Sequence, residues 1–202
     1  MSQAERAIVL ERFTIGYNVV EGLIAVTFGV IAGSIALTGF GFDSWIEVTA
    51  AAVVLHRLRA EVAGGVPDEA KERRALRVVA VTFFVLAIYV TVEGVRDLAT
   101  GDQPSITVVG MVLTALSAVV MPALARQKKA AGEAMNSRLV LADAAETKLC
   151  AWLSVSTLAG LAGFAAFGLS WIDPFAGFVI AYFAVREGRE AWEGELVCDD
   201  ED

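Results

Sequence analysis

The stretch Gly39-Phe40-Gly41-Phe42-Asp43-Ser44-Trp45-Ile46-Glu47-Val48 puts two carboxylates inside an apolar segment that runs from Leu37 to Leu58. Asp43 and Glu47 are four residues apart, so they share one face of a helix. Carboxylates within a membrane-spanning helix are energetically costly, and they usually face a bundle interior or a polar cavity. The segment therefore predicts a transmembrane helix that carries a site for an ion or a proton.

The composition of the whole chain is that of a membrane protein. Of its 202 residues 56% are hydrophobic, and the mean hydropathy is +0.62. A helix needs about 20 apolar residues to cross a hydrocarbon core of roughly 30 Å. Six apolar segments predict an all-α membrane protein with six transmembrane helices, the last of them short: residues 13–31, 37–58, 76–95, 106–124, 139–161 and 171–184.

Basic residues gather on one side of these predicted spans. The segments between the second and third spans and between the fourth and fifth hold ten Lys and Arg residues: Arg57, Arg59, Lys71, Arg73, Arg74, Arg77, Arg126, Lys128, Lys129 and Arg138. Positively charged loops stay on the cytoplasmic side. We therefore expect cytoplasmic termini, a transmembrane domain over residues 1–190 and an acidic cytoplasmic tail over residues 191–202. The net charge of −8 comes largely from this tail and from carboxylates inside the spans, so it indicates no nucleic-acid partner.

A second pair with four-residue spacing, Glu146 and Cys150, lies in the fifth predicted span. Glu47 and Cys150 each lie twelve residues from an arginine at the cytoplasmic end of their span, which is about 18 Å at 1.5 Å per residue. The two pairs therefore lie at similar depths near the middle of the membrane. If the two helices are neighbours, Asp43, Glu47, Glu146 and Cys150 present four ligands around one point.

Several short motifs occur in a fixed order along the chain. Residues 33–37 (Gly-Ser-Ile-Ala-Leu) precede Asp43 and Glu47, residues 92–98 read Val-Glu-Gly-Val-Arg-Asp-Leu, and Asp173-Pro174 begins the last span. Residues 142–150 read Ala-Asp-Ala-Ala-Glu-Thr-Lys-Leu-Cys. Together they resemble the cation diffusion facilitator (cation efflux) superfamily, which has Asp-x-x-x-Asp in its second helix and Ala-Asp-x-x-His-x-x-x-Asp in its fifth. In this chain Glu47 and Cys150 replace aspartates, and Glu146 replaces the histidine.

This resemblance is to compact bacterial members of the superfamily that lack a cytoplasmic C-terminal domain. It implies a homodimeric, secondary-active exporter of divalent metal ions in the bacterial inner membrane, working by metal/proton antiport between the second and fifth helices. It implies no cofactor. Motifs such as Gly-x-Ser-x-Gly and His-Glu-x-x-His do not occur, so we expect no enzyme. The alternative is a non-transporting membrane metal sensor or partner protein that retains the fold.

The ligand types narrow the choice of ion. Three carboxylates and a thiolate favour Zn²⁺, which accepts oxygen, nitrogen and sulfur donors in tetrahedral geometry. Fe²⁺, Co²⁺, Cd²⁺ and Mn²⁺ are alternatives, and a thiolate argues against a hard ion. A free cysteine is also a common small buried hydrophobe, which leaves Asp143 as the other possible fourth ligand. Asn18, Glu21 and Asp143 are predicted to support the ligands by hydrogen bonds or to form a proton path.

Overall fold

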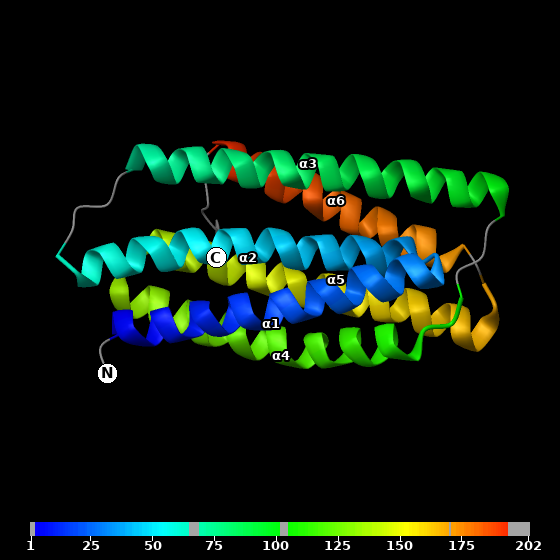
Figure 1. Cartoon of the computed structure of the whole chain (residues 1–202), viewed down its shortest axis with the longest axis horizontal. Coiled ribbons are helices and arrows are strands. Elements are labelled where there is room, and N and C mark those ends of the chain that lie inside the picture. Colours follow the sequence, from blue (N-terminus) through cyan, green and yellow to red (C-terminus); the bar gives the residue numbers. More distant parts are fainter. Residues whose placement is uncertain (1–2, 65–68, 102–104, 170, 194–202) are drawn as a thin grey trace, which may run out of the picture.

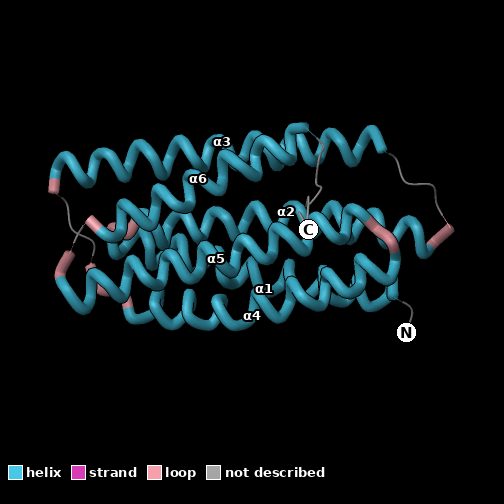
Figure 2. The backbone as a smooth tube through the Cα atoms, turned by 180° about the vertical axis from the view of Figure 1, so that it is seen from behind, coloured by secondary structure: helices cyan, strands magenta, loops and turns pink. Residues whose placement is uncertain are grey.

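The computed structural model describes residues 3–64, 69–101, 105–169 and 171–193, and every secondary-structure element in that part of the chain is a helix. The helices are α1 (Gln3–Ala32), α2 (Ile35–Val62), α3 (Glu69–Thr100), α4 (Val108–Met135), α5 (Arg138–Phe167) and α6 (Ile172–Glu193). All six run along the long axis of the molecule, and short connections join them (Figures 1 and 2). The predicted all-α, six-helix architecture is confirmed. Residues 194–202 of the predicted tail lie outside the described residues.

Helix α2 occupies the centre of the bundle. It packs against α1 and also contacts α3, α5 and α6, while α4 packs against α1 and α5. Helices α3 and α6 pair with each other and lie along one edge of the bundle, and α1 and α4 lie along the opposite edge (Figure 1). Side chains on α2 can therefore face four different helices, which suits a helix that carries a binding site.

The helices are longer than the predicted spans. Helix α4 continues through Pro122 and ends at Met135, eleven residues beyond the predicted end at Leu124. Its 28 residues reach about 42 Å at 1.5 Å per residue, against a hydrocarbon thickness of roughly 30 Å. Hydropathy marks where the chain leaves apolar surroundings, not where its helical hydrogen bonds end, so the prediction stopped at the first charged residues.

Apolar residues cover the outside of the bundle, and inside it buried polar residues lie among the residues of an apolar core. The inner face of α1 buries Glu11, Thr14, Asn18 and Glu21. The outer face of α3 exposes a valine and isoleucine stripe with exposed fractions of 48–64%: Val81, Val85, Ile88, Val92 and Val95. A helix bundle in water has the opposite arrangement, so this surface suits lipid.

By length and composition alone, α1, α4 and residues 139–167 of α5 are each apolar enough to cross a membrane. Within the described residues α2, α3 and α6 do not meet the same criterion. Helix α2 carries Asp43 and Glu47, and the described ends of α3 and α6 carry further charges. The acidic pocket described below accounts for part of this lower apolarity, because Asp43 and Glu47 of α2 and Glu187 of α6 line it. Helix α3 contributes Phe83 to the pocket, so its charges belong to the ends of the helix and not to the pocket.

The connection between α1 and α2 is tight. Gly33 turns the chain with a φ of +65°, a conformation that favours glycine because it lacks a Cβ atom. One turn earlier, a Cβ atom on Gly29 would lie 2.5 Å from Thr38 Oγ1, so the two helices touch at this glycine. The first residues of α2 are thereby held close to the end of α1.

Asp173, near the start of α6, caps the N-terminus of α2. Its carboxylate accepts hydrogen bonds from Ser34 Oγ at 2.5 Å, from the Ile35 amide at 2.9 Å and from the Ala36 amide at 3.4 Å. A carboxylate at this position satisfies free amide groups and interacts favourably with the helix dipole. The Asp173-Pro174 motif therefore joins the beginnings of α2 and α6.

We expect Asp173→Ala to destabilise the protein by about 1–3 kcal/mol, because the variant leaves buried donors without acceptors. The measurement is the thermal unfolding midpoint of the full chain purified in detergent. Glu193→Gln, at the exposed opposite end of α6, is the control and should not shift the midpoint. Equal midpoints for Asp173→Ala and wild type would show that this cap does not stabilise the bundle.

Candidate metal site

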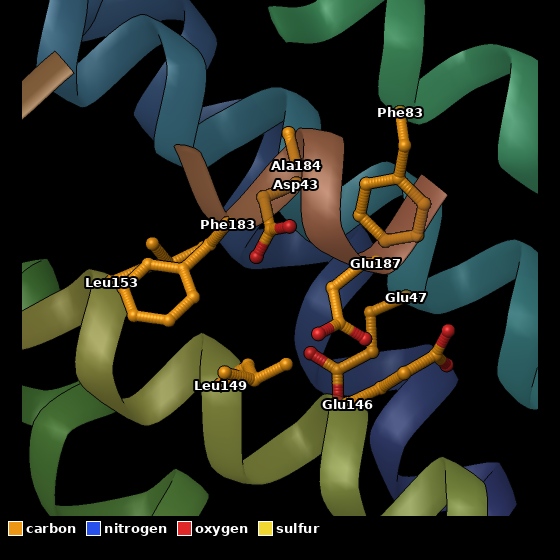
Figure 3. A pocket seen from close by; sticks show the side chains of 9 residues that line it. All are labelled: Asp43, Glu47, Phe83, Glu146, Leu149, Leu153, Phe183, Ala184 and Glu187. Atoms are coloured by element: carbon orange, nitrogen blue, oxygen red, sulfur yellow. The ribbon is translucent and has the colours of Figure 1, made fainter. Parts of the chain in front are cut away.

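A pocket between α2, α3, α5 and α6 contains four carboxylates (Figure 3). Asp43 and Glu47 come from α2, Glu146 from α5 and Glu187 from α6. The remaining lining residues are apolar: Phe83, Leu149, Leu153, Phe183 and Ala184. The pocket therefore combines a high density of negative charge with hydrophobic walls.

Three of the four predicted ligands line this pocket, and Cys150 does not. The pocket face of α5 is formed by Glu146, Leu149 and Leu153, and Cys150 lies at the edge of that face. Its side chain is 2% exposed and belongs to the apolar core of the bundle, with the thiol close to Asp43 and Glu47. A ligand role for Cys150 stays a prediction.

The carboxylates share the pocket without converging on one point. Among the described residues, no three His, Cys, Asp or Glu side chains lie close enough together to hold one metal ion. Figure 3 shows the carboxylates of Glu47 and Glu187 pointing into the same part of the pocket, while the carboxylate of Glu146 points to one side. Metal binding here would require rotation of these flexible side chains.

Thr147 holds Glu47 in place. Its hydroxyl donates to Glu47 Oε1 at 2.8 Å and also lies 3.0 Å from the carbonyl oxygen of Asp143, one turn earlier in α5. The other carboxylate oxygen, Glu47 Oε2, is buried and has no hydrogen-bond partner among the described residues. The bond from α5 to α2 thus orients Glu47 and leaves one of its oxygens available in the pocket.

A second buried ionic cluster lies beside the pocket and contains Lys128 of α4. Its ammonium group is 3.1 Å from Glu11 Oε2 and 2.5 Å from Asp143 Oδ2, and all three side chains are at most 2% exposed. The sequence pattern places Lys128 in a basic segment between the fourth and fifth predicted spans. This prediction is wrong, because Lys128 lies within α4 and its side chain is buried in the bundle. Asp143, predicted as a possible ligand or part of a proton path, is paired with Lys128 in this structure.

The two other predicted supporting residues lie on the inner face of α1. Glu21 Oε2 accepts a hydrogen bond from Ser44 Oγ at 3.0 Å, which links α1 to α2 next to Asp43. Asn18 Nδ2 donates to the Thr14 carbonyl oxygen at 3.0 Å. Neither residue lines the pocket, and their predicted part in a proton path stays a prediction.

Sequence reasoning missed Glu187, because the sixth predicted span ended three residues earlier, at Ala184. A signal for it existed in the helical periodicity. Residues Ala176, Ile180, Ala184 and Glu187 recur every three to four positions, and all of them are buried. The same spacing along α4 brings Lys128 onto the buried stripe that also contains Ser117 and Met121.

We expect Lys128→Met to lower the unfolding free energy by about 3–5 kcal/mol, because it leaves two buried carboxylates without their positive partner. The measurement is thermal or denaturant unfolding of the detergent-purified chain. Lys129→Met is the matched control, since the Lys129 side chain is exposed and its ammonium group lies 4.0 Å from Glu133 Oε1. If the two variants proved equally stable, the buried cluster would have no structural role.

The chain was also compared with known proteins. Residues 75–194 match the family model described as the cation efflux transmembrane domain. An uncharacterized transporter of Methanocaldococcus jannaschii is 27% identical over 193 residues, which cover 92% of this chain and 66% of the relative. The manganese efflux system protein MneS of Bacillus subtilis is 26% identical over 187 residues, which cover 89% of this chain and 62% of that protein. This chain thus spans slightly less than two thirds of the length of these relatives. With its apolar outer surface and the family match over more than half of its length, the chain is an integral membrane protein that belongs to the cation efflux transmembrane domain family.

Proposed function

We propose that this protein is a secondary-active exporter of divalent metal ions that works by metal/proton antiport through the acidic pocket. The observation that carries the proposal is that Asp43, Glu47 and Glu146 line one pocket of a protein of the cation efflux family. Carboxylates inside a membrane bundle are typical of ion and proton pathways. A purely structural role would favour carboxylates paired with cations, as at Lys128.

Proton coupling follows from the chemistry of the ligands. A carboxylate or thiol has to lose its proton before it binds a metal ion, so metal binding releases protons. In an apolar pocket an ionised carboxylate without a counter-charge is unfavourable. The carboxylate is therefore ionised when a metal ion is bound and protonated when the metal ion has left. Protons that enter from the opposite side of the membrane would displace the metal ion. This exchange is the antiport that we propose.

The identity of the transported ion depends on the ligands and is also suggested by a relative of this chain. A thiolate ligand from Cys150 would favour Zn²⁺, as the sequence predicts. Mn²⁺ is the other leading candidate, because a relative over 89% of this chain is named a manganese efflux system protein and because Mn²⁺ prefers oxygen ligands. Fe²⁺, Co²⁺ and Cd²⁺ are further ions to test.

The proposed setting is the bacterial inner membrane, with both termini in the cytoplasm and two copies of the chain per transporter. The basic residues near the ends of α2 and α4 and near the beginnings of α3 and α5 support this orientation by the positive-inside rule, even without Lys128. The start of α1 and the end of α6 lie toward the same end of the bundle, as an even number of crossings requires (Figure 1). The homodimer is an expectation from the family resemblance.

The test is metal flux into proteoliposomes that contain a pH-sensitive dye, with Zn²⁺, Mn²⁺, Fe²⁺ and Cd²⁺ compared. We expect wild type to move metal ions against protons and Asp43→Asn to lose both signals. Glu93→Gln is the control, because Glu93 lies on α3 outside the pocket and pairs with the exposed Arg96. Binding without flux for every ion would favour the alternative, a membrane metal sensor or partner protein.

The hydrogen bond from the Thr147 hydroxyl orients Glu47 in the pocket. We expect Thr147→Val to weaken metal affinity by about 10–100-fold, the usual effect of removing a group that orients a ligand. Thr157→Val provides the control on the same helix, since the buried Thr157 hydroxyl has no hydrogen-bond partner among the described residues. The measurement is calorimetric metal binding to the purified chain, and equal affinities for the two variants would contradict an orienting role for Thr147.

A further inference from the structure

We propose that Glu187 of α6 is a metal ligand and completes an all-carboxylate site with Asp43, Glu47 and Glu146. Glu187 thereby takes the place predicted for Cys150 and adapts the pocket to a hard divalent ion such as Mn²⁺. The inference deepens the proposed function and rests on it in taking a metal ion as the occupant of the pocket.

The position of Glu187 distinguishes it from the other acidic residues of α6. It lines the pocket and is 6% exposed, although it lies in the last two turns of the helix among charged neighbours. Arg186 precedes it in the chain but turns outward, and its Nε atom donates to Glu190 Oε1 at 2.9 Å. No hydrogen bond or ion pair joins Glu187 to another residue within the described parts of the chain. The carboxylate is therefore buried without a direct ion-pair partner, and the charge of Arg186 acts on it only from beyond ion-pair distance.

The pocket also contains an acceptor with no donor. Glu47 Oε2 is fully buried and unpartnered among the described residues, and the Glu47 side chain points into the same part of the pocket as Glu187 (Figure 3). Buried polar atoms in folded proteins are nearly always bonded, so an open acceptor indicates a missing partner. A cation between Glu47 and Glu187 supplies that partner for both side chains.

Charge and size favour a divalent metal ion over an organic or monovalent cation. Four carboxylates meet in the pocket, and the nearest buried cation, Lys128, is already shared by Glu11 and Asp143. The walls are the side chains of leucine, phenylalanine and alanine, which offer no donors to hold an organic ligand. A divalent metal ion neutralises more of this negative charge than a monovalent ion, and it needs less space than an organic cation.

The ligand types point to the class of ion. Oxygen-only sites suit hard ions such as Mn²⁺ and Mg²⁺, whereas a thiolate selects softer ions. With Glu187 from a third helix, the pocket contains four carboxylates without the thiol of Cys150, which is close to Asp43 and Glu47 but does not line the pocket. Once these side chains rotate toward one point, carboxylates alone can supply the ligands for Mn²⁺.

The experiment measures metal binding to the full chain in detergent, with Mn²⁺ followed by loss of the free-ion electron paramagnetic resonance signal and Cd²⁺ followed by calorimetry. We expect Glu187→Gln to weaken Mn²⁺ binding by at least about tenfold. We also expect Glu187→Cys to raise the Cd²⁺-to-Mn²⁺ affinity ratio by at least about tenfold, because a thiolate prefers the softer ion. Glu190→Gln, one turn away on the same helix, should bind Mn²⁺ like wild type.

Unchanged Mn²⁺ binding in Glu187→Gln overturns the inference, and so does a Cd²⁺-to-Mn²⁺ ratio that Glu187→Cys leaves unchanged. The second variant separates a ligand from a residue that only stabilises the pocket, since a structural defect weakens both ions alike. Failure of wild type to bind Mn²⁺ also overturns it. Mn²⁺ binding that depends on Glu187, without flux in proteoliposomes, supports the inference and contradicts the exporter. Flux that depends on Asp43 but not on Glu187 supports the exporter and contradicts the inference.

Discussion

The ammonium group of Lys128 is the buried charge on which the packing of α1, α4 and α5 depends. It lies against Glu11 and Asp143, where an ionised carboxylate without a positive partner would be strongly unfavourable. The pairing sets the register of the three helices relative to one another. Asp143 also lies one turn before Thr147, whose hydroxyl donates to Glu47, so the Lys128 cluster is connected to the acidic pocket through α5.

The pocket and the Lys128 cluster use the same residue types for different purposes. In the cluster a lysine of the chain itself supplies the counter-charge, and its atoms are nearly inaccessible to solvent. In the pocket the carboxylates of Asp43, Glu47, Glu146 and Glu187 have no such partner among the described residues, and Glu47 keeps an unbonded oxygen. A region that lacks its own cation is suited to accept and release an external one. This contrast is the physical basis for the proposed transport.

The location of the pocket depends on α2 in turn. Its N-terminus is capped by Asp173 of α6, its contact with α1 is permitted by Gly29, and its Glu47 is bonded from α5. These contacts come from three different helices and lie at different heights along α2. A carboxylate on the middle turns of α2 is thereby placed among fixed neighbours, whereas Glu187 reaches the pocket from the end of α6.

Much of the fold and part of the candidate metal site can be predicted from the sequence alone. Apolar segments of membrane-spanning length indicate six helices, and the four-residue spacing of Asp43 and Glu47 indicates an inward acidic face, because both depend only on local periodicity. The pair Glu146 and Cys150 could be placed at a depth similar to that of Asp43 and Glu47 because helical rise is constant. The tertiary structure decided which helices are neighbours, which way each one is rotated and where each one ends. The buried positions of Lys128 and Glu187 could not be predicted, because both residues follow the apolar part of a helix, where hydropathy indicates a loop. Only the packing of their helices against neighbouring helices places these side chains inside the bundle.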